Sequence, residues 1–409
     1  MTHLQGISGF SFAEGGVVAP RGFVSSGIAA GLKSGGKRDI AVVAAKECVP
    51  AAAVFTTNRV AAAPVIVSRR HIAGGCVRAL VVNAANANAC TGTQGERDAE
   101  SMALTLAEAL SCHAEQIIVA STGVIGVPLP VDRILSAIPE AVATLDDRNG
   151  THAAEAIMTT DTFPKEIAVS FELEGRRITV GGMAKGSGMI APNMATMIAV
   201  LTTDAPLSSD GCDRVLRAAV ATTFNRITVD SDSSTNDTAL LMASGEAGGD
   251  IIGPDSPGFT SVAQAIHVVA GELARMIARD GEGATKLVTV TVGGAASDAD
   301  AEKAAFAVAN SPLVKTALFG SDANWGRVAG AVGRSGADVD PDKLDIDFAG
   351  IPMCRSGCGV TFDEDEAASA LSGTEVEISV NLNLGEGAAV VWTCDLSYEY
   401  VRINGDYRS

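Results

Sequence analysis

The sequence predicts a mixed α/β or α+β protein. Short apolar runs typical of strands alternate with amphipathic helical patterns over much of the 409-residue chain, and strictly alternating strand patterns gather near its C-terminus. About 47% of the residues are hydrophobic, which is enough to fill a sizeable core and excludes a disordered chain. A chain of this length usually divides into two or three domains.

The first strands are expected at three apolar runs, residues 40–44, 78–82 and 116–120. The second run leads into a polar segment rich in Asn, Gly and Thr, and the third leads into the turn Ser121-Thr122-Gly123. Between these two runs, residues 95–111 place their apolar side chains on one helical face. The order strand, helix, strand supports the mixed class.

The clearest helix is predicted over residues 259–279, because its apolar residues recur at spacings of three and four. It ends at Asp280-Gly281-Glu282-Gly283, where glycines favour the left-handed conformation that terminates helices. A strand over 287–292 and helices over 300–309 and 324–332 are expected to follow. Residues 376–384 and 390–400 alternate apolar and polar side chains around a Gly-Glu-Gly turn, which predicts a β-hairpin with one buried face.

The charge balance excludes a protein that binds the nucleic-acid backbone. The chain carries 30 Lys and Arg against 48 Asp and Glu, a net charge of −18, whereas phosphate neutralisation needs a basic surplus. The N-terminus lacks the pattern of a signal peptide, and the longest uncharged stretch, 186–203, is interrupted by Pro192 and Asn193. We therefore expect a cytoplasmic protein that does not bind membranes.

Metal and nucleotide sites are not indicated. The eight cysteines lack zinc-like pairs and the density of a disulfide scaffold, so reduced thiols are expected. The segment Gly181–Ser187 places Lys before Gly and so misses the order of a phosphate loop. Asp230–Asp237 resembles a calcium loop, but Thr235 and Leu241 replace the required Gly and Glu. We interpret it as a polar turn that caps residues 238–243.

The most unusual segment is Lys185–Met197 (KGSGMIAPNMATM), in which a Gly- and Pro-containing turn precedes a strand-like run that starts at Thr196. A hydroxyl placed there can attack the Ala195 carbonyl, and hydrolysis of the resulting ester frees the Thr196 α-amine. Such an amine titrates near pH 8 and can serve as the base for its own hydroxyl. The alternative is an ordinary threonine at the start of a strand.

This segment closely resembles the self-cleavage motif of the ornithine acetyltransferase family, the glutamate N-acetyltransferases of arginine biosynthesis. Further segments similar to the family follow in its order over essentially the whole chain. They are residues 16–23 (GVVAPRGF), 54–60 (VFTTNRV), 86–92 (NANACTG), 121–126 (STGVIG), 230–237 (DSDSSTND), 324–327 (NWGR) and 403–409 (INGDYRS).

The resemblance implies an αββα sandwich of the self-processing, N-terminal-nucleophile-like aminopeptidase/ornithine acetyltransferase type. A catalytic domain, 1–284, would be cut between Ala195 and Thr196 into an α chain, 1–195, and a β chain, 196–409. A C-terminal α+β lobe, 285–409, would return its tail to the active site. The two chains would stay associated as an α2β2 heterotetramer.

The resemblance also implies the site residues. Thr196 would be the nucleophile, and Thr122 and Gly123 would stabilise the oxyanion. The substrate contacts would be Thr160, Lys185, Thr196, Glu282, Asn404 and Ser409, the last standing where many relatives carry Thr. Taken as residues alone, Lys185 and Glu282 are typical of solvated loop charges, and Thr122-Gly123 of an ordinary turn.

The implied activity is acetyl transfer from N2-acetylornithine to L-glutamate by a ping-pong mechanism through acetyl-Thr196, without metal or organic cofactor. The sequence leaves open whether acetyl-CoA is also a donor. One alternative keeps the fold but gives the acyl group to water, as a self-processed amidase or aminopeptidase. Another is a non-catalytic protein that binds amino acids and stays uncut.

Overall fold

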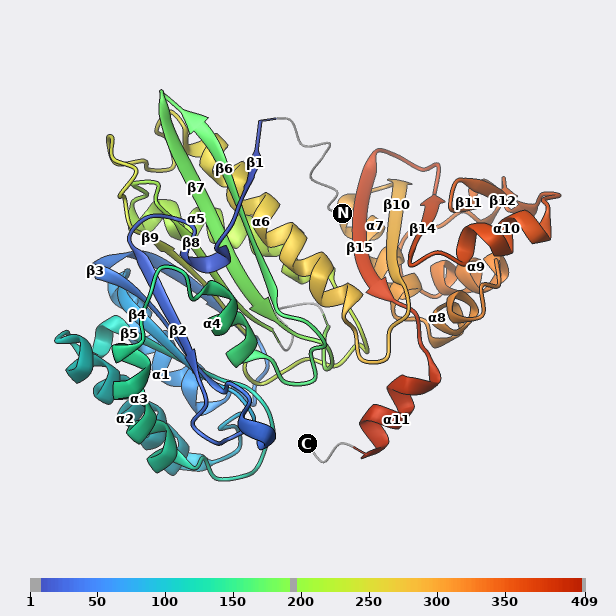
Figure 1. The fold of residues 1–409 in the computed structure, drawn as a ribbon. Coiled ribbons are helices and arrows are strands. Elements are labelled where there is room, and N and C mark those ends of the chain that lie inside the picture. The colour runs from blue at the N-terminus through green and yellow to red at the C-terminus, as the bar shows by residue number, and fades with distance from the viewer. Residues whose placement is uncertain (1–8, 192–196, 407–409) are drawn as a thin grey trace.

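The computed structural model describes residues 9–191 and 197–406, and within these ranges nine strands form one sheet and six strands form another. The first sheet has the order β1-β6-β7-β8-β9-β3-β4-β5, with β2 also paired to β3. In Figure 1 the first sheet and its helices form one body, and β10 to β15 form a second body beside it.

The nine-stranded sheet folds into two layers through the long strand β3 (Ile40–Phe55). Residues 40–45 of β3 pair with β2, while residues 51–55 pair with β9. The first layer also holds β2 (Phe23–Ile28), β4 (Cys76–Asn83) and β5 (Ile117–Ser121). The second holds β1 (Ser11–Ala13), β6 (Lys165–Leu173), β7 (Arg176–Lys185), β8 (Ile198–Thr203) and β9 (Thr238–Ala243).

Helices cover the outer faces of both layers. The first layer packs on α1 (Ala63–His71), α2 (Gly92–Leu110) and α3 (Val131–Ala143), and the second on α5 (Ser209–Thr222) and α6 (Phe259–Arg279). Between the layers, α4 (Gly150–Ile157) joins the shared core. Short 3-10 helices occupy Gly16–Val18, Ser34–Gly36, Ile72–Gly74, Ala114–Gln116, Phe224–Arg226 and Pro341–Lys343.

Strand β3 shows why the sequence produces this sandwich. Ile40 and Val42 face the helices of the first layer, whereas Ala41 and Val43 face the second layer. All four are fully buried. A strand covered on both faces is apolar at successive positions, which is why the run appears continuous in the sequence. The predicted αββα sandwich is confirmed.

The second sheet has the order β13-β12-β11-β14-β10-β15. Its strands are β10 (Leu287–Ala295), β11 (Asp345–Phe348), β12 (Ile351–Arg355), β13 (Cys358–Gly359), β14 (Glu375–Asn381) and β15 (Gly387–Cys394). One face packs with α7 (Asp298–Ala309), α8 (Pro312–Phe319), α9 (Trp325–Gly333) and α10 (Glu364–Leu371). The last helix, α11 (Tyr398–Asp406), extends away from this lobe in Figure 1.

The predicted C-terminal hairpin is wrong. Strands β14 and β15 do not pair with each other, because β10 lies between them, parallel to β14 and antiparallel to β15. The alternating pattern also ends earlier than predicted, since β15 stops at Cys394 and the helix α11 begins at Tyr398. Alternation records which face of a strand is buried, but it does not record which strand lies next to it.

The cysteine prediction is wrong for one pair. Cys48 in β3 and Cys76 in β4 form a disulfide, with Cα atoms 5.7 Å apart. These residues lie 28 positions apart in the chain and meet only through the register of the two strands, so their spacing gives no signal. The remaining six cysteines are free.

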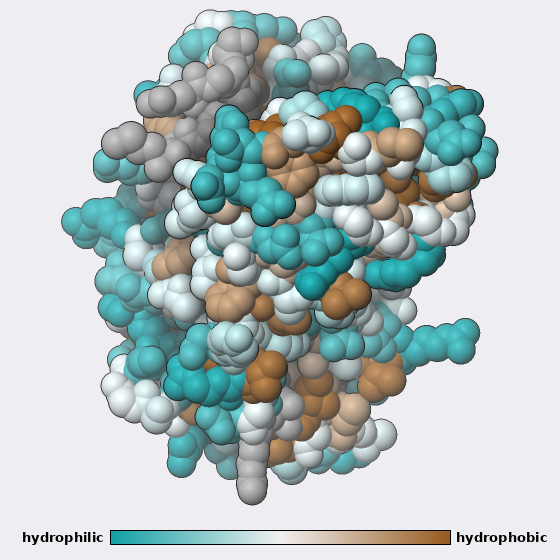
Figure 2. Space-filling view, turned by 90° about the vertical axis from the view of Figure 1, so that its right-hand side faces the viewer, coloured by the Kyte–Doolittle hydropathy of each residue, from teal (hydrophilic) through white to brown (hydrophobic). Residues whose placement is uncertain are grey.

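Figure 2 views the side of the molecule on which the C-terminal lobe lies in Figure 1; hydrophobic residues occur there as separate spots between hydrophilic ones. Within the described ranges, no helix has both the length and the apolar character needed to cross a bilayer.

Candidate active site

Six of the predicted site residues line one cavity of about 130 Å³, here called the site cavity. They are Thr122, Gly123, Thr160, Lys185, Glu282 and Asn404. The other three, Ala195, Thr196 and Ser409, lie outside the described residues. The site cavity thus collects residues from a strand end, three loops and the C-terminal helix.

The Thr122-Gly123 turn follows directly after β5 and has a backbone that only glycine fits. Gly123 has φ +133°, and a Cβ atom there would lie 2.2 Å from the carbonyl carbon of Ala85. The flanking N–H groups of Thr122 and Val124 donate to carbonyls of the 83–85 segment. The Gly123 N–H has no acceptor among the described residues. A fixed N–H of this kind suits the stabilisation of an oxyanion.

Asn236 holds this turn in place. Its side-chain amide donates to the carbonyl oxygens of Ala87, at 2.6 Å, and Ser121, at 2.8 Å. The Ser121 hydroxyl in turn donates to Asn83 Oδ1 at 2.5 Å. Because β4 and β5 are parallel, Asn83 and Ser121 end neighbouring strands at the same edge of the sheet. The turn is therefore positioned by buried polar groups.

Lys185, at the end of β7, belongs to a buried network of charges. Lys165 Nζ lies 2.7 Å from Asp161 Oδ1 and 2.5 Å from Asp280 Oδ2. Asp161 Oδ2 lies 4.0 Å from Lys185 Nζ, and Asp161 Oδ1 also accepts the Gly186 N–H at 2.7 Å. The side chains of Lys165 and Asp161 are fully buried. Buried ions persist when paired, so this network fixes the position of Lys185.

The network also sets the protonation of its members. Burial alone would raise the pKa of Asp161, but Lys185 and Lys165 together with hydrogen bonds hold that pKa well below its usual value. Burial lowers the pKa of Lys185, and the negative charges of Asp161, Glu282 and Asp237 act against that shift. The protonation of Lys185 thus depends on the surrounding carboxylates.

Glu282 joins the helix α11 to the site cavity. Its Oε2 accepts a hydrogen bond from Asn404 Nδ2 at 2.8 Å. The carboxylate lies directly against Gly188, where a Cβ atom would come within 2.4 Å of it. The Glu282 N–H donates to Ser187 O at 2.8 Å. Glycine at 188 therefore permits a close approach of Glu282 to the loop that follows β7.

Asp230 and Asp237 hold the chain on either side of residues 192–196. Asp230 accepts the N–H groups of Met189, at 2.6 Å, and Ile190, at 2.8 Å, while Asp237 Oδ1 accepts the Met197 N–H at 2.9 Å. Burial raises the pKa of both carboxyls, that of Asp237 well above its usual value. As predicted, residues 230–237 contain no helix or strand. The predicted capping of residues 238–243 is wrong, because these residues form the buried strand β9, and capping of this kind belongs to helices.

Comparisons with known proteins agree with this geometry. A family model described as the ArgJ family matches residues 24–409. The arginine biosynthesis bifunctional protein ArgJ of Symbiobacterium thermophilum is 52% identical over 397 residues, which are 97% of this chain and 99% of that protein. The chain belongs to the ArgJ family.

Other ArgJ proteins support this membership. The bifunctional ArgJ of Caldanaerobacter subterraneus subsp. tengcongensis is 48% identical over 400 residues, or 97% of this chain and 99% of that protein. A crystal structure of ArgJ from Bacillus halodurans is 44% identical, with a TM-score of 0.50 over 51% of this chain and 98% of that one. As the sequence predicted, the protein is an acetyltransferase of arginine biosynthesis that acts on small molecules.

Several residues of this ArgJ-family site were missed from the sequence. Asp161, Lys165 and Asp280 were not singled out, although Asp161 follows Thr160 and Asp280 lies two residues before Glu282. Asn236 and Asp237 were noticed, but only as parts of a turn. Among the described residues, no group of three or more His, Cys, Asp or Glu side chains is arranged to hold a metal ion.

Proposed function

We propose that this enzyme transfers the acetyl group of N2-acetylornithine to L-glutamate through an acetyl ester on Thr196. The observation that carries the proposal is that the Thr122-Gly123 turn, the buried Lys185 and Glu282 converge on one cavity. Thr196 directly precedes Met197, which Asp237 holds through its N–H. The reaction needs hydrogen-bond donors for an oxyanion, a cation for a substrate carboxylate and an anion for a substrate ammonium group.

The chemistry runs in two half-reactions. The Thr196 hydroxyl attacks the acetyl carbonyl, its proton passes through the Thr196 α-amine to the leaving amine, and the C–N bond breaks to release ornithine. The α-amine of glutamate then attacks the acetyl ester, the C–O bond breaks, and the hydroxyl is restored. In both steps negative charge develops on the carbonyl oxygen, which the Gly123 N–H and the Thr122 hydroxyl would stabilise.

Substrate recognition follows from the two charges of the site cavity. Lys185 would bind the α-carboxylate shared by donor and acceptor, and Glu282 would bind the ammonium group of the ornithine side chain. Thr160, Asn404 and Ser409 would add hydrogen bonds. The contact between Asn404 and Glu282 supports a site that the C-terminal tail completes.

We propose that Thr196 first cuts the chain after Ala195, giving an α chain, 1–195, and a β chain, 196–409. The pairing of β7 and β8 supports continued association of the two chains, because Lys185 and Ile198 are register partners on opposite sides of the cut. The division into a catalytic domain, 1–284, and a lobe, 285–409, is part of the same proposal, as is the α2β2 heterotetramer.

The proposed reaction needs no metal or organic cofactor, since every role falls to a protein group. Acetyl-CoA would serve as a second acetyl donor. Incubation with acetyl-CoA that is radiolabelled in its acetyl group tests this, because the label should then appear in N-acetylglutamate. A cytoplasmic location is also proposed. Six free cysteines beside one disulfide fit a reducing compartment better than an oxidising one.

Intact-mass measurement tests the proposal. The natural sequence should give two fragments, of which the one starting at Thr196 gains an acetyl group from N2-acetylornithine; Thr196→Ala should stay uncut and inert. Release of acetate without consumption of glutamate would instead favour the amidase. An uncut chain that binds amino acids without becoming acetylated would favour the binding protein. Full turnover by an uncut chain would refute the mechanism.

A further inference from the structure

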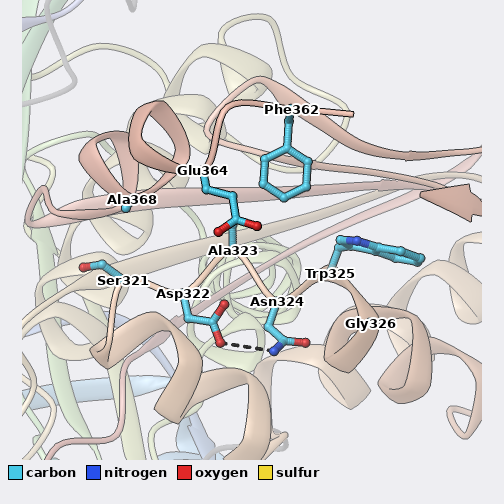
Figure 3. Close-up of a pocket in the computed structure, with 9 residues that line it drawn as sticks. All are labelled: Ser321, Asp322, Ala323, Asn324, Trp325, Gly326, Phe362, Glu364 and Ala368. Carbon is cyan, nitrogen blue, oxygen red and sulfur yellow. Dashed lines mark hydrogen bonds between the residues drawn. The ribbon is translucent and has the colours of Figure 1, made fainter. Parts of the chain in front are cut away.

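A second cavity, of about 450 Å³, lies in the C-terminal lobe and shares no described lining residue with the site cavity. We call it the lobe cavity. It is formed by the turn after α8, the first residues of α9, the segment that leads into α10, and α10 itself. Its lining residues are Ser321, Asp322, Ala323, Asn324, Trp325, Gly326, Phe362, Glu364 and Ala368 (Figure 3).

Two aromatic rings and two carboxylates surround the opening of the lobe cavity. Figure 3 shows the rings of Trp325 and Phe362 on one side and the carboxylates of Asp322 and Glu364 on the other. The rings are partly buried, whereas both acidic residues are exposed. Flat apolar surfaces beside negative charge are the combination that recognises organic cations.

No described basic side chain neutralises these carboxylates. Within residues 9–191 and 197–406, neither Asp322 nor Glu364 forms an ion pair, and Asp322 accepts a side-chain hydrogen bond only from Asn324 Nδ2, at 3.1 Å. The guanidinium of Arg327 donates to Leu313 O at 2.7 Å. Lys286 Nζ donates hydrogen bonds to backbone carbonyl oxygens of α8 and α10. The two carboxylates of the lobe cavity therefore have no described side-chain cation as an ion-pair partner.

The walls of the lobe cavity are fixed without a ligand. Ser321 has φ 54°, a left-handed conformation that is uncommon for serine, and its hydroxyl accepts a hydrogen bond from Lys286 Nζ at 2.8 Å. The ring of Trp325 lies directly on Gly359, where a Cβ atom would approach Cζ2 to 2.8 Å. Asn324 caps the first turn of α9 through its side-chain oxygen. A preorganised wall lowers the cost of binding.

We propose that the lobe cavity binds a flat organic cation of the alkylguanidinium class. The planar guanidinium would stack on Trp325 or Phe362 and donate hydrogen bonds to the carboxylates of Asp322 and Glu364. A guanidinium offers five donors in one plane and a weakly hydrated face, so it can bind the carboxylates and the aromatic rings at the same time. An ammonium ion satisfies only the carboxylates, and an anion is repelled.

Tryptophan fluorescence tests this proposal directly. The chain has two tryptophans, so Trp392→Phe leaves Trp325 as the only reporter. In that background, agmatine should change the emission saturably, whereas 4-aminobutylurea, which keeps the ammonium group but replaces the guanidinium with a planar neutral urea, should not. Glu364→Gln and Asp322→Asn should each weaken agmatine binding about tenfold or more, because each removes a charge-assisted hydrogen bond. Ala368→Leu, which fills the cavity without changing its charge, should weaken it as well.

Matched variants separate the lobe cavity from other acidic groups. Glu366→Gln removes an exposed charge of α10 outside the cavity and should leave agmatine binding unchanged. Glu282→Gln, in the site cavity, should also leave it unchanged. No fluorescence response to agmatine, equal binding by Glu364→Gln and Asp322→Asn, or loss of binding in Glu282→Gln would each overturn the proposal. The readout does not require acetyl transfer, so it is independent of the proposed reaction.

Discussion

The two cavities of this protein use charge in opposite ways. Around the site cavity, charged groups such as Lys165 and Asp161 are completely buried and bonded to one another. Around the lobe cavity, Asp322 and Glu364 are exposed and have no described ion-pair partner. Buried, mutually bonded charges fix the geometry of a site, whereas exposed unpaired charges are free to receive a ligand. Four predictions sharpen this contrast.

The largest loss of stability is expected from Lys165→Met. The change leaves Asp161 and Asp280 buried with one cation fewer, and breaking a buried ion pair in this way costs about 3–5 kcal/mol. Urea unfolding measures the cost. It should be done in the uncut Thr196→Ala background, so that a single chain unfolds. A loss below about 1 kcal/mol would show that the network does not support the fold.

After Thr196→Ala, the largest loss of activity is expected from Gly123→Ala. The added Cβ would collide with the backbone at Ala85 and displace the N–H that is proposed to stabilise the oxyanion. Loss of one such donor lowers kcat by roughly 10²–10³. Gly126→Ala is the matched control, because Gly126 also has positive φ but has open space around it. If both variants retain normal kcat, the turn plays no part in the reaction.

Asp237→Asn should change the pH dependence of stability. Because the native pKa of Asp237 is raised by burial, the folded chain holds this proton more tightly than the unfolded chain does. That stabilisation is complete below the ordinary Asp pKa near 3.8 and is lost as the pH rises through the native value. Relative to Asp237→Asn, the natural chain should therefore lose stability as the pH rises.

The control for this pH dependence is Asp161→Asn, whose sign is opposite. The native pKa of Asp161 is lowered, so its stabilisation is present above the ordinary value and lost as the pH falls below it. Urea unfolding of both variants from acid to neutral pH, again in the Thr196→Ala background, gives the two slopes. Equal slopes would contradict the assigned protonation states.

The smallest effect is expected from Lys343→Met in the lobe. Lys343 Nζ lies 3.4 Å from Asp340, and both side chains are exposed. Exposed pairs contribute less than about 1 kcal/mol, because solvent screens them and their side chains lose freedom. The same urea titration measures this change, and a cost comparable to that of Lys165→Met would erase the difference between the two regions.

Most of the fold was accessible from local patterns. The helix at 259–279 was located to the residue, because apolar side chains recur every three or four positions and glycines follow its end. The hairpin at 376–400 failed, because the strand that separates β14 from β15 comes from residues 287–295, far earlier in the chain. Long-range pairing leaves no trace in the alternation of a strand.

The candidate site was accessible only in part. Thr122, Gly123, Lys185 and Glu282 stood out because family-like segments or glycines surround them. Lys165 and Asp280 did not stand out, because a sequence does not distinguish a charged residue that is buried from one that is exposed to solvent. Their burial depends on loops that meet only in the folded chain. Sequence patterns therefore located the groups proposed to touch substrate better than the groups that hold them.

Strand β8 has a consequence for how the enzyme matures. It lies between β7, which the proposed cut assigns to the α chain, and β9, which it assigns to the β chain. In a fragment that ends at residue 195, the edge of β7 that pairs with β8 would have unsatisfied backbone hydrogen-bonding groups, and such an exposed edge promotes aggregation. Synthesis as a single polypeptide allows β7 and β8 to pair before the chain is cut, so this edge is not exposed. The two halves should assemble poorly when they are expressed from separate genes.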